Sequence, residues 1–104
     1  MNLSAVKRVT LFKFTEDKGG QVNIYVEPTD EAKGRLIVCN ANRIYQRFFD
    51  GCNPGIYAFL ARQPVEAICS CFTDEDEDYE YAMKMLKDVW TLFIEHIKET
   101  HQLG

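Results

Sequence analysis

The chain has 104 residues, of which 46% are hydrophobic and 27% are charged, so it is long enough for one folded domain with its own core and too short for two. No apolar run approaches the ~18 residues that a membrane-spanning helix needs, and the first seven residues lack the apolar block of a secretory signal. We therefore expect residues 1–104 to form a single cytoplasmic domain with no membrane partner.

The net charge of −4 is unevenly distributed along the chain. Residues 1–63 carry nine Lys/Arg and six Asp/Glu, a balance of +3, whereas residues 64–104 carry three and ten, a balance of −7. A polyanion would be repelled by the second part and attracted only weakly by the first. The charge pattern thus argues against direct nucleic-acid binding.

Two segments near the amino terminus have the pattern of a β-hairpin. Residues 6–15 are rich in β-branched and aromatic side chains, and residues 21–27 alternate strictly between apolar and polar. Residues 17–20, which include Gly19 and Gly20, supply the turn between them. Pro28 ends the second strand, and the apolar residues 35–39 predict a third, more central strand.

The next segments are harder to assign from their pattern. Residues 43–50 carry apolar pairs four apart, Ile44 with Phe48 and Tyr45 with Phe49, which predicts a short helix capped by Asn40 or Asn42. The apolar run 56–61 fits a strand or a helical piece, and its flanking glycine and proline favour a strand.

Residues 65–72 are interpreted as the last strand. Cys69 and Cys71 would then share one buried face of that strand, as small hydrophobic residues do.

The carboxyl-terminal segment predicts a long helix from about residue 74 to residue 101. Its apolar residues recur at steps of three and four and form a continuous stripe: Tyr79, Ala82, Met83, Leu86, Val89, Trp90, Phe93 and Ile97. The expected fold is therefore α+β. An antiparallel sheet of four or five strands packs on this helix, with a short helix inserted after the third strand.

This helix carries more apolar surface than one sheet would cover. Tyr81, Met85 and Leu92 form a second line, well round the helix from the main stripe. Excess apolar surface usually marks a protein interface, and a symmetric homodimer is the simplest partner. The alternative is that residues 40–50 pack beside the helix and cover this second line.

An acidic run fills the first turns of this helix. Six of the seven residues 74–80 are Asp or Glu. They match a solvated helix start, where negative charge is favourable, or a patch that binds a basic nucleic-acid-handling protein, with Asp74, Asp76 and Glu77 as contacts. A calcium loop is excluded because Tyr79 and Met85 occupy the positions of its glycine and its bidentate acid.

Two weaker alternatives concern small-molecule chemistry. Arg43, Tyr45 and Arg47 could clamp a nucleotide or an acidic peptide, including the acidic run of a second copy. Cys52, in an expected loop, is the best candidate for a nucleophile in a cysteine-dependent enzyme. The spacing of the four cysteines matches no common zinc site, and no cofactor motif is present.

From these observations we expect a small non-enzymatic regulator or inhibitor that binds another protein and occludes its surface. The carboxyl-terminal helix would supply the contacts, and the protein would act as a homodimer or against a larger target. The alternative is a small-ligand or nucleotide-binding domain that uses the Arg43, Tyr45 and Arg47 patch.

Overall fold

The computed structural model describes residues 9–15, 20–72 and 76–101, without the side chains of residues 76 and 77. Within them, four strands precede three helices: β1 Thr10–Thr15, β2 Gln21–Asp30, β3 Lys33–Cys39, β4 Ile44–Phe49, α1 Ile56–Ala61, α2 Val65–Phe72 and α3 Asp76–Thr100. The fold is α+β, as the sequence predicts. Its sheet is an antiparallel meander in the order β1-β2-β3-β4.

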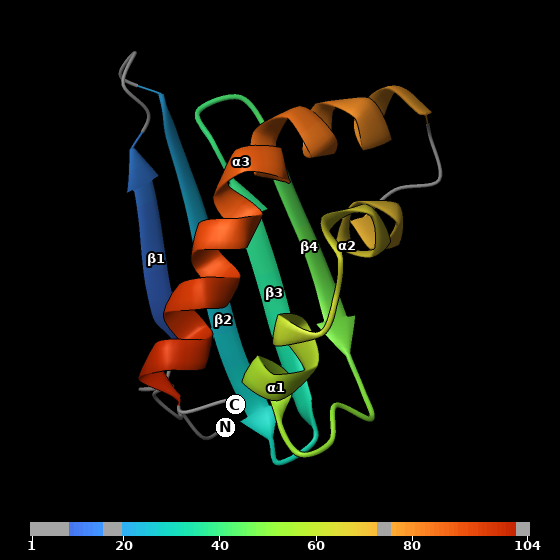
Figure 1. The fold of residues 1–104 in the computed structure, drawn as a ribbon. Helices are drawn as coiled ribbons and strands as arrows, with labels where there is room; N and C mark the ends of the chain where they lie inside the picture. The colour runs from blue at the N-terminus through green and yellow to red at the C-terminus, as the bar shows by residue number, and fades with distance from the viewer. Residues whose placement is uncertain (1–8, 16–19, 73–75, 102–104) are drawn as a thin grey trace, which may run out of the picture.

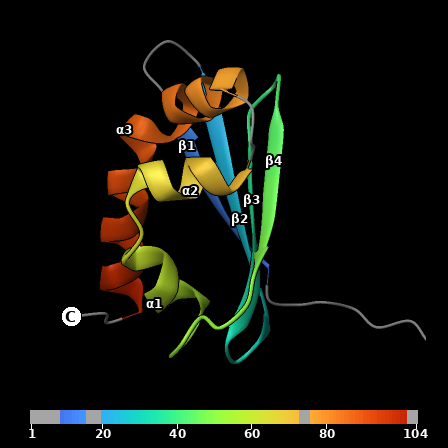
Figure 2. The same ribbon diagram turned by 90° about the vertical axis from the view of Figure 1, so that its right-hand side faces the viewer.

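The helices form one layer against one face of the sheet (Figures 1 and 2). α3 runs along β1 and β2, α1 lies near the lower end of the sheet, and α2 lies beside β4 (Figure 1). The apolar side chains between the two layers form the core. Those with no exposed surface include Ile24, Val26, Leu36, Val38, Leu60, Leu86, Phe93 and Ile97.

Aromatic contacts and one indole hydrogen bond fix the helices on the sheet. Phe12 of β1 meets Phe93 of α3 edge to face, with the ring centroids 5.1 Å apart. Trp90 of α3 donates its indole N–H to the carbonyl of Gln63, between α1 and α2, at 2.8 Å. The long helix therefore contacts both the sheet and the connection between the short helices.

The predicted helix over residues 43–50 is wrong, because this segment is strand β4. Residues four apart share a face in a strand as well as in a helix, so the pairs Ile44/Phe48 and Tyr45/Phe49 fit both. In the strand the two pairs lie on opposite faces: Tyr45 and Phe49 are buried, and Ile44 and Phe48 are exposed. Pairing with β3 selects the extended form.

The predicted strands over residues 56–61 and 65–72 are also wrong, because these segments are helices α1 and α2. In α1, Ile56 and Leu60 are buried four residues apart, one helical turn. In α2, Cys69 is buried and Cys71 is exposed, so they do not share a face. Two residues span about 200° of a helix, which separates side chains that a strand would align.

Candidate protein-binding surface

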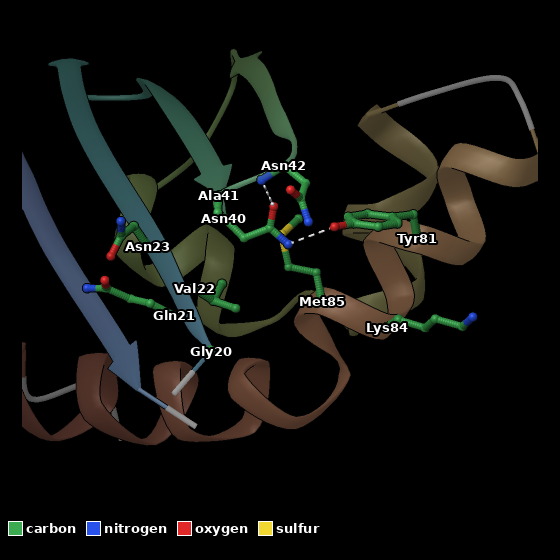
Figure 3. A pocket seen from close by; sticks show the side chains of 10 residues that line it. All are labelled: Gly20, Gln21, Val22, Asn23, Asn40, Ala41, Asn42, Tyr81, Lys84 and Met85. Carbon is green, nitrogen blue, oxygen red and sulfur yellow. Dashed lines mark hydrogen bonds between the residues drawn. The ribbon is translucent and has the colours of Figure 1, made fainter. Parts of the chain in front are cut away.

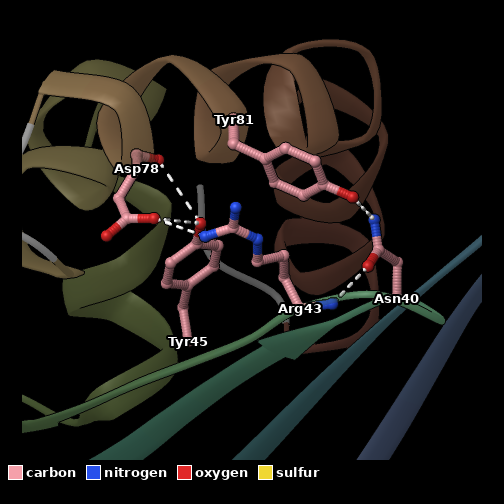
Figure 4. A network of polar contacts seen from close by, with 5 residues as sticks. All are labelled: Asn40, Arg43, Tyr45, Asp78 and Tyr81. Carbon is pink, nitrogen blue, oxygen red and sulfur yellow. Dashed lines mark hydrogen bonds and ion pairs between the residues drawn. The ribbon is translucent and has the colours of Figure 1, made fainter.

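A polar network joins the β3–β4 connection to the first turns of α3 (Figure 4). Arg43 forms an ion pair with Asp78, with Nη1 and Oδ1 2.6 Å apart. The Arg43 guanidinium lies 4.9 Å from the ring centroid of Tyr81, a cation–π contact. The Tyr81 hydroxyl accepts a hydrogen bond of 3.0 Å from the side-chain amide of Asn40.

This environment moves the pKa values of two tyrosines in opposite directions. The amide hydrogen bond from Asn40, followed by that from Asn42, lowers the pKa of Tyr81 because both stabilise the phenolate. Burial, and then the nearby charge of Asp78, raise the pKa of Tyr45. Tyr45 also stacks on Phe72 of α2 at 5.6 Å between ring centroids, so its ring belongs to the core.

The candidate ligand patch of Arg43, Tyr45 and Arg47 is therefore divided in the folded chain. Arg43 is already paired with Asp78, and Tyr45 is only 8% exposed. Arg47 is exposed and lies opposite Leu36 on β3. The structure uses two of these three residues for its own packing.

The three apolar partner residues of the long helix have different environments. Met85 is 5% exposed and belongs to the core, and Tyr81 is partly buried against it. Leu92 is 56% exposed. α3 changes direction along its length, and its first turns cross the end of the sheet beside the β3–β4 connection (Figure 1). That bend covers Tyr81 and Met85 within the chain and leaves Leu92 outside.

The acidic run is described only in part. Asp74 lies outside the described residues, and so do the side chains of Asp76 and Glu77, whose backbone begins α3. Asp78, a member of this run, forms the ion pair with Arg43. At least one member of the run thus neutralises a base of the same chain.

An open cavity of about 610 Å³ lies where the bend of α3 meets the end of the sheet (Figure 3). Residues at the start of β2 and just before it, of the β3–β4 connection and of α3 line it: Gly20, Gln21, Val22, Asn23, Asn40, Ala41, Asn42, Tyr81, Lys84 and Met85. The Asn40–Tyr81 hydrogen bond spans one side of it, and Lys84 points away (Figure 3). Its polar groups do not converge on a common point as in a built ligand site.

The two buried cysteines, Cys52 and Cys69, do not resemble activated nucleophiles. Cys52 has no exposed surface, and its burial, followed by the charge of Asp50, raises the pKa of its thiol. Burial also raises the pKa of Cys69 to about 11. Both side chains are therefore neutral thiols near pH 7. Among the described residues, no group of three or more His, Cys, Asp or Glu is placed to hold a metal ion.

The face of the sheet opposite the helices is the main surface that the sequence analysis missed. No described helix covers it (Figure 2). We call it the open sheet face, and it carries Leu11, Lys13, Asn23, Tyr25, Glu27, Arg35, Ile37, Cys39, Ile44, Gln46 and Phe48, as strand register and burial show. Leu11 is 39%, Ile44 72% and Phe48 47% exposed. The strict alternation of β2 was the signal for a second face, but the wrong helix over residues 43–50 concealed its extent.

Comparison of the chain with known proteins identified no relative. No family model, no curated protein and no solved structure matches this chain. In the part of the chain that the structure describes, no helix is long and apolar enough to span a bilayer.

Proposed function

We propose that the protein is a small non-enzymatic regulator that binds another protein through the open sheet face and occludes the bound surface. The observation that carries this proposal is the set of exposed apolar side chains on that face, above all Leu11, Ile44 and Phe48. An antiparallel sheet that faces water usually presents polar residues there. Exposed apolar residues on such a face, connected across the sheet through Tyr25 and Ile37, instead favour a protein interface.

The charges of the open sheet face indicate the chemistry of its partner. Its charged residues are Lys13, Glu27 and Arg35, so the face is nearly neutral. A nucleic acid would require a cluster of bases, and a basic target would require a cluster of acids. The partner that fits is a folded protein with an apolar, nearly neutral surface patch.

A pair of matched leucine variants tests this proposal. Leu11→Lys places a charge on the open sheet face, and Leu92→Lys places the same charge on the outer side of α3, where the native leucine is also exposed. The tagged full-length chain, wild type or variant, is expressed in its native cells, cross-linked and purified, and bound proteins are quantified by mass spectrometry. We expect a partner that wild type and Leu92→Lys retain equally and that Leu11→Lys loses at least tenfold.

The opposite pattern, loss with Leu92→Lys and retention with Leu11→Lys, would assign binding to α3 and contradict the proposal. Equal retention by both variants, or no partner with the wild type, would contradict it as well. Circular dichroism of the purified variants checks that both remain folded.

A further inference from the structure

β4 is an edge strand whose outward side has no strand beside it among the described residues. The backbone of an edge strand can pair with another chain unless charges, prolines or bulges prevent it. The other edge, β1, carries Lys13 on the open sheet face. β4 carries Ile44, Gln46 and Phe48 there, with no charge.

The register of the β3–β4 hairpin shows which backbone groups of β4 point outward. The N–H of Asn40 donates to the carbonyl of Arg43 at 3.0 Å, so this pair is hydrogen-bonded. Hydrogen-bonded and non-hydrogen-bonded pairs alternate along antiparallel strands. The backbone groups of Tyr45, Arg47 and Phe49 are therefore hydrogen-bonded to β3. The backbone groups of Ile44, Gln46 and Phe48 point away from β3.

The outward residues are Ile44, Gln46 and Phe48. No described residue is hydrogen-bonded to their outward N–H or carbonyl groups. Their side chains lie on the open sheet face, and all three are exposed. On the open sheet face, β4 therefore combines free backbone groups with uncharged, largely apolar side chains, and its one charged residue, Arg47, is exposed on the opposite face.

We propose that β4 pairs in antiparallel orientation with β4 of a second copy, about a twofold axis at Gln46. This inference rests on the proposed function, because it names a partner that uses the β4 side of the open sheet face. Gln46 lies opposite the partner's Gln46, and Ile44 lies opposite the partner's Phe48. Each outward N–H group of one copy then donates to an outward carbonyl of the other.

The side chains of the open sheet face fit this register. On the open sheet face, Ile44 of each copy packs beside the partner's Phe48, a β-branched and aromatic pair that stabilises neighbouring strands. On the opposite face, Tyr45 lies opposite the partner's Arg47, so no like charges meet. A pairing centred on Gln46 brings together the two apolar side chains of β4 that the single chain leaves most exposed.

The geometry predicts a disulfide that reports this register. Opposed residues of a hydrogen-bonded antiparallel pair have Cα atoms about 5.5 Å apart, within the Cα range for a disulfide, and a movement of about 1 Å brings their Cβ atoms into range as well. We expect Gln46→Cys to form a covalent dimer on mild oxidation in a Cys39→Ser, Cys71→Ser background. That background removes the exposed thiol of Cys71 and the free thiol of Cys39, which lies opposite residue 44 in the β3–β4 pair. Ile44→Cys alone should not, because the partner's Ile44 lies four residues away, about 14 Å at ~3.4 Å per residue. A mixture of Ile44→Cys and Phe48→Cys should cross-link.

A proline variant tests the same pairing without new thiols. Gln46→Pro removes an N–H that points away from β3, so the single chain keeps its own sheet hydrogen bonds. Two hydrogen bonds across the axis are lost, and we expect the dimer dissociation constant to rise roughly 10- to 100-fold. Light scattering over a dilution series measures it, with Gln46→Ala as the control that keeps the N–H.

Several outcomes would overturn the dimer. The first is a wild-type chain that stays monomeric throughout the dilution series. The second is a dimer in which two Ile44→Cys chains cross-link with each other while two Gln46→Cys chains do not. A monomer whose captured partner is lost with Leu11→Lys would refute this inference and leave the proposed function intact. A dimer with no other captured partner would support the inference and refute occlusion of a separate target. If Gln46→Pro does not fold, the cysteine variants still decide.

Discussion

Arg43 and Asp78 show how side chains that suggest binding can be used within the fold. Both belong to segments that the sequence marks as candidate sites, one basic and one acidic, and the structure pairs them at 2.6 Å. Their side chains are 48% and 27% exposed. An ion pair with this much exposure to water contributes at most about 1 kcal/mol to the free energy of unfolding. The pair therefore orients the β3–β4 connection against α3 more than it stabilises the protein.

The tyrosines beside this ion pair should titrate in a defined order. The pKa of Tyr81 lies below its ordinary value because of the hydrogen bond from Asn40, and the pKa of Tyr45 lies above it because of burial. Ultraviolet absorbance of phenolate should therefore show Tyr81 ionising before Tyr45. Tyr81→Phe should remove an early part of the transition, and Tyr45→Phe a late part.

Unfolding at alkaline pH provides the matching stability measurement. Because folding raises the pKa of Tyr45, its contribution to stability is fully present below about pH 10 and is lost as pH rises through the folded value. The pH dependence expected from Tyr81 has the opposite sign. Because its pKa is lowered, its contribution to stability is present above about pH 10 and is lost as the pH falls through the lowered pKa. The free energy of unfolding of Tyr45→Phe should consequently decrease less steeply with rising pH than that of the wild type. An unchanged pH dependence would contradict the burial of Tyr45.

At the level of elements, the segments with a single clear periodicity were the ones that sequence predicted well. The alternation of Val22, Ile24 and Val26 predicts β2 from Gln21, but β2 continues through Pro28 to Asp30, where it still pairs with β3. The apolar stripe of the last segment predicts the end of α3 to within one residue, and its expected start near residue 74 lies outside the described residues. β4 was missed because a four-residue spacing fits a strand and a helix equally. Only its pairing with β3 separates the two, and that contact is not local in sequence.

α2 was a different kind of error, because its pattern was present in the sequence. The apolar residues of the segment follow helical spacing: Val65, Ile68, Cys69 and Phe72. In the structure, the hydroxyl of Ser70 donates a hydrogen bond of 2.7 Å to the carbonyl of Glu66, one helical turn earlier. The positions of the candidate site residues depended on these assignments, so the open sheet face could not be derived from the sequence.

The close contact between β3 and α1 gives a prediction for stability. A Cβ atom on Gly34 would lie 2.8 Å from Cγ1 of Ile56, closer than packed carbon atoms approach. We expect Gly34→Ala to lower the free energy of unfolding by roughly 1–3 kcal/mol, the cost of overpacking. Denaturant unfolding followed by circular dichroism measures it.

A double-mutant cycle separates this clash from other effects of the substitution. Ile56→Ala removes Cγ1 and Cδ1, which would lie 2.8 and 3.1 Å from the new methyl group, and leaves Cβ at 3.0 Å. Gly34→Ala should therefore cost less in the Ile56→Ala background than in the wild type. Equal costs in both backgrounds would show that the helix does not approach β3 this closely.

At the scale of the whole molecule, the fold has a layer of helices on one side of the sheet and no described layer on the other (Figure 2). Two-layer domains of this kind bury one sheet face, and the other meets solvent or a partner. Here the second face holds apolar residues on both edge strands, Leu11 on β1 and Ile44 and Phe48 on β4. Pairing through β4 would join two such faces into one wider surface, which a single chain cannot present.

The salt dependence of self-association distinguishes this arrangement from the charge-driven dimer that the sequence suggests. Each copy carries a net charge of −4, so two copies repel each other, and added salt screens that repulsion. If hydrogen bonds and apolar contacts of β4 hold the dimer, its dissociation constant should fall as sodium chloride is raised. If the acidic run of one copy instead binds Arg43 and Arg47 of the other, the same salt weakens the attraction and the constant should rise. Analytical ultracentrifugation at low and high ionic strength measures the sign, and a constant that rises with salt would contradict pairing through β4.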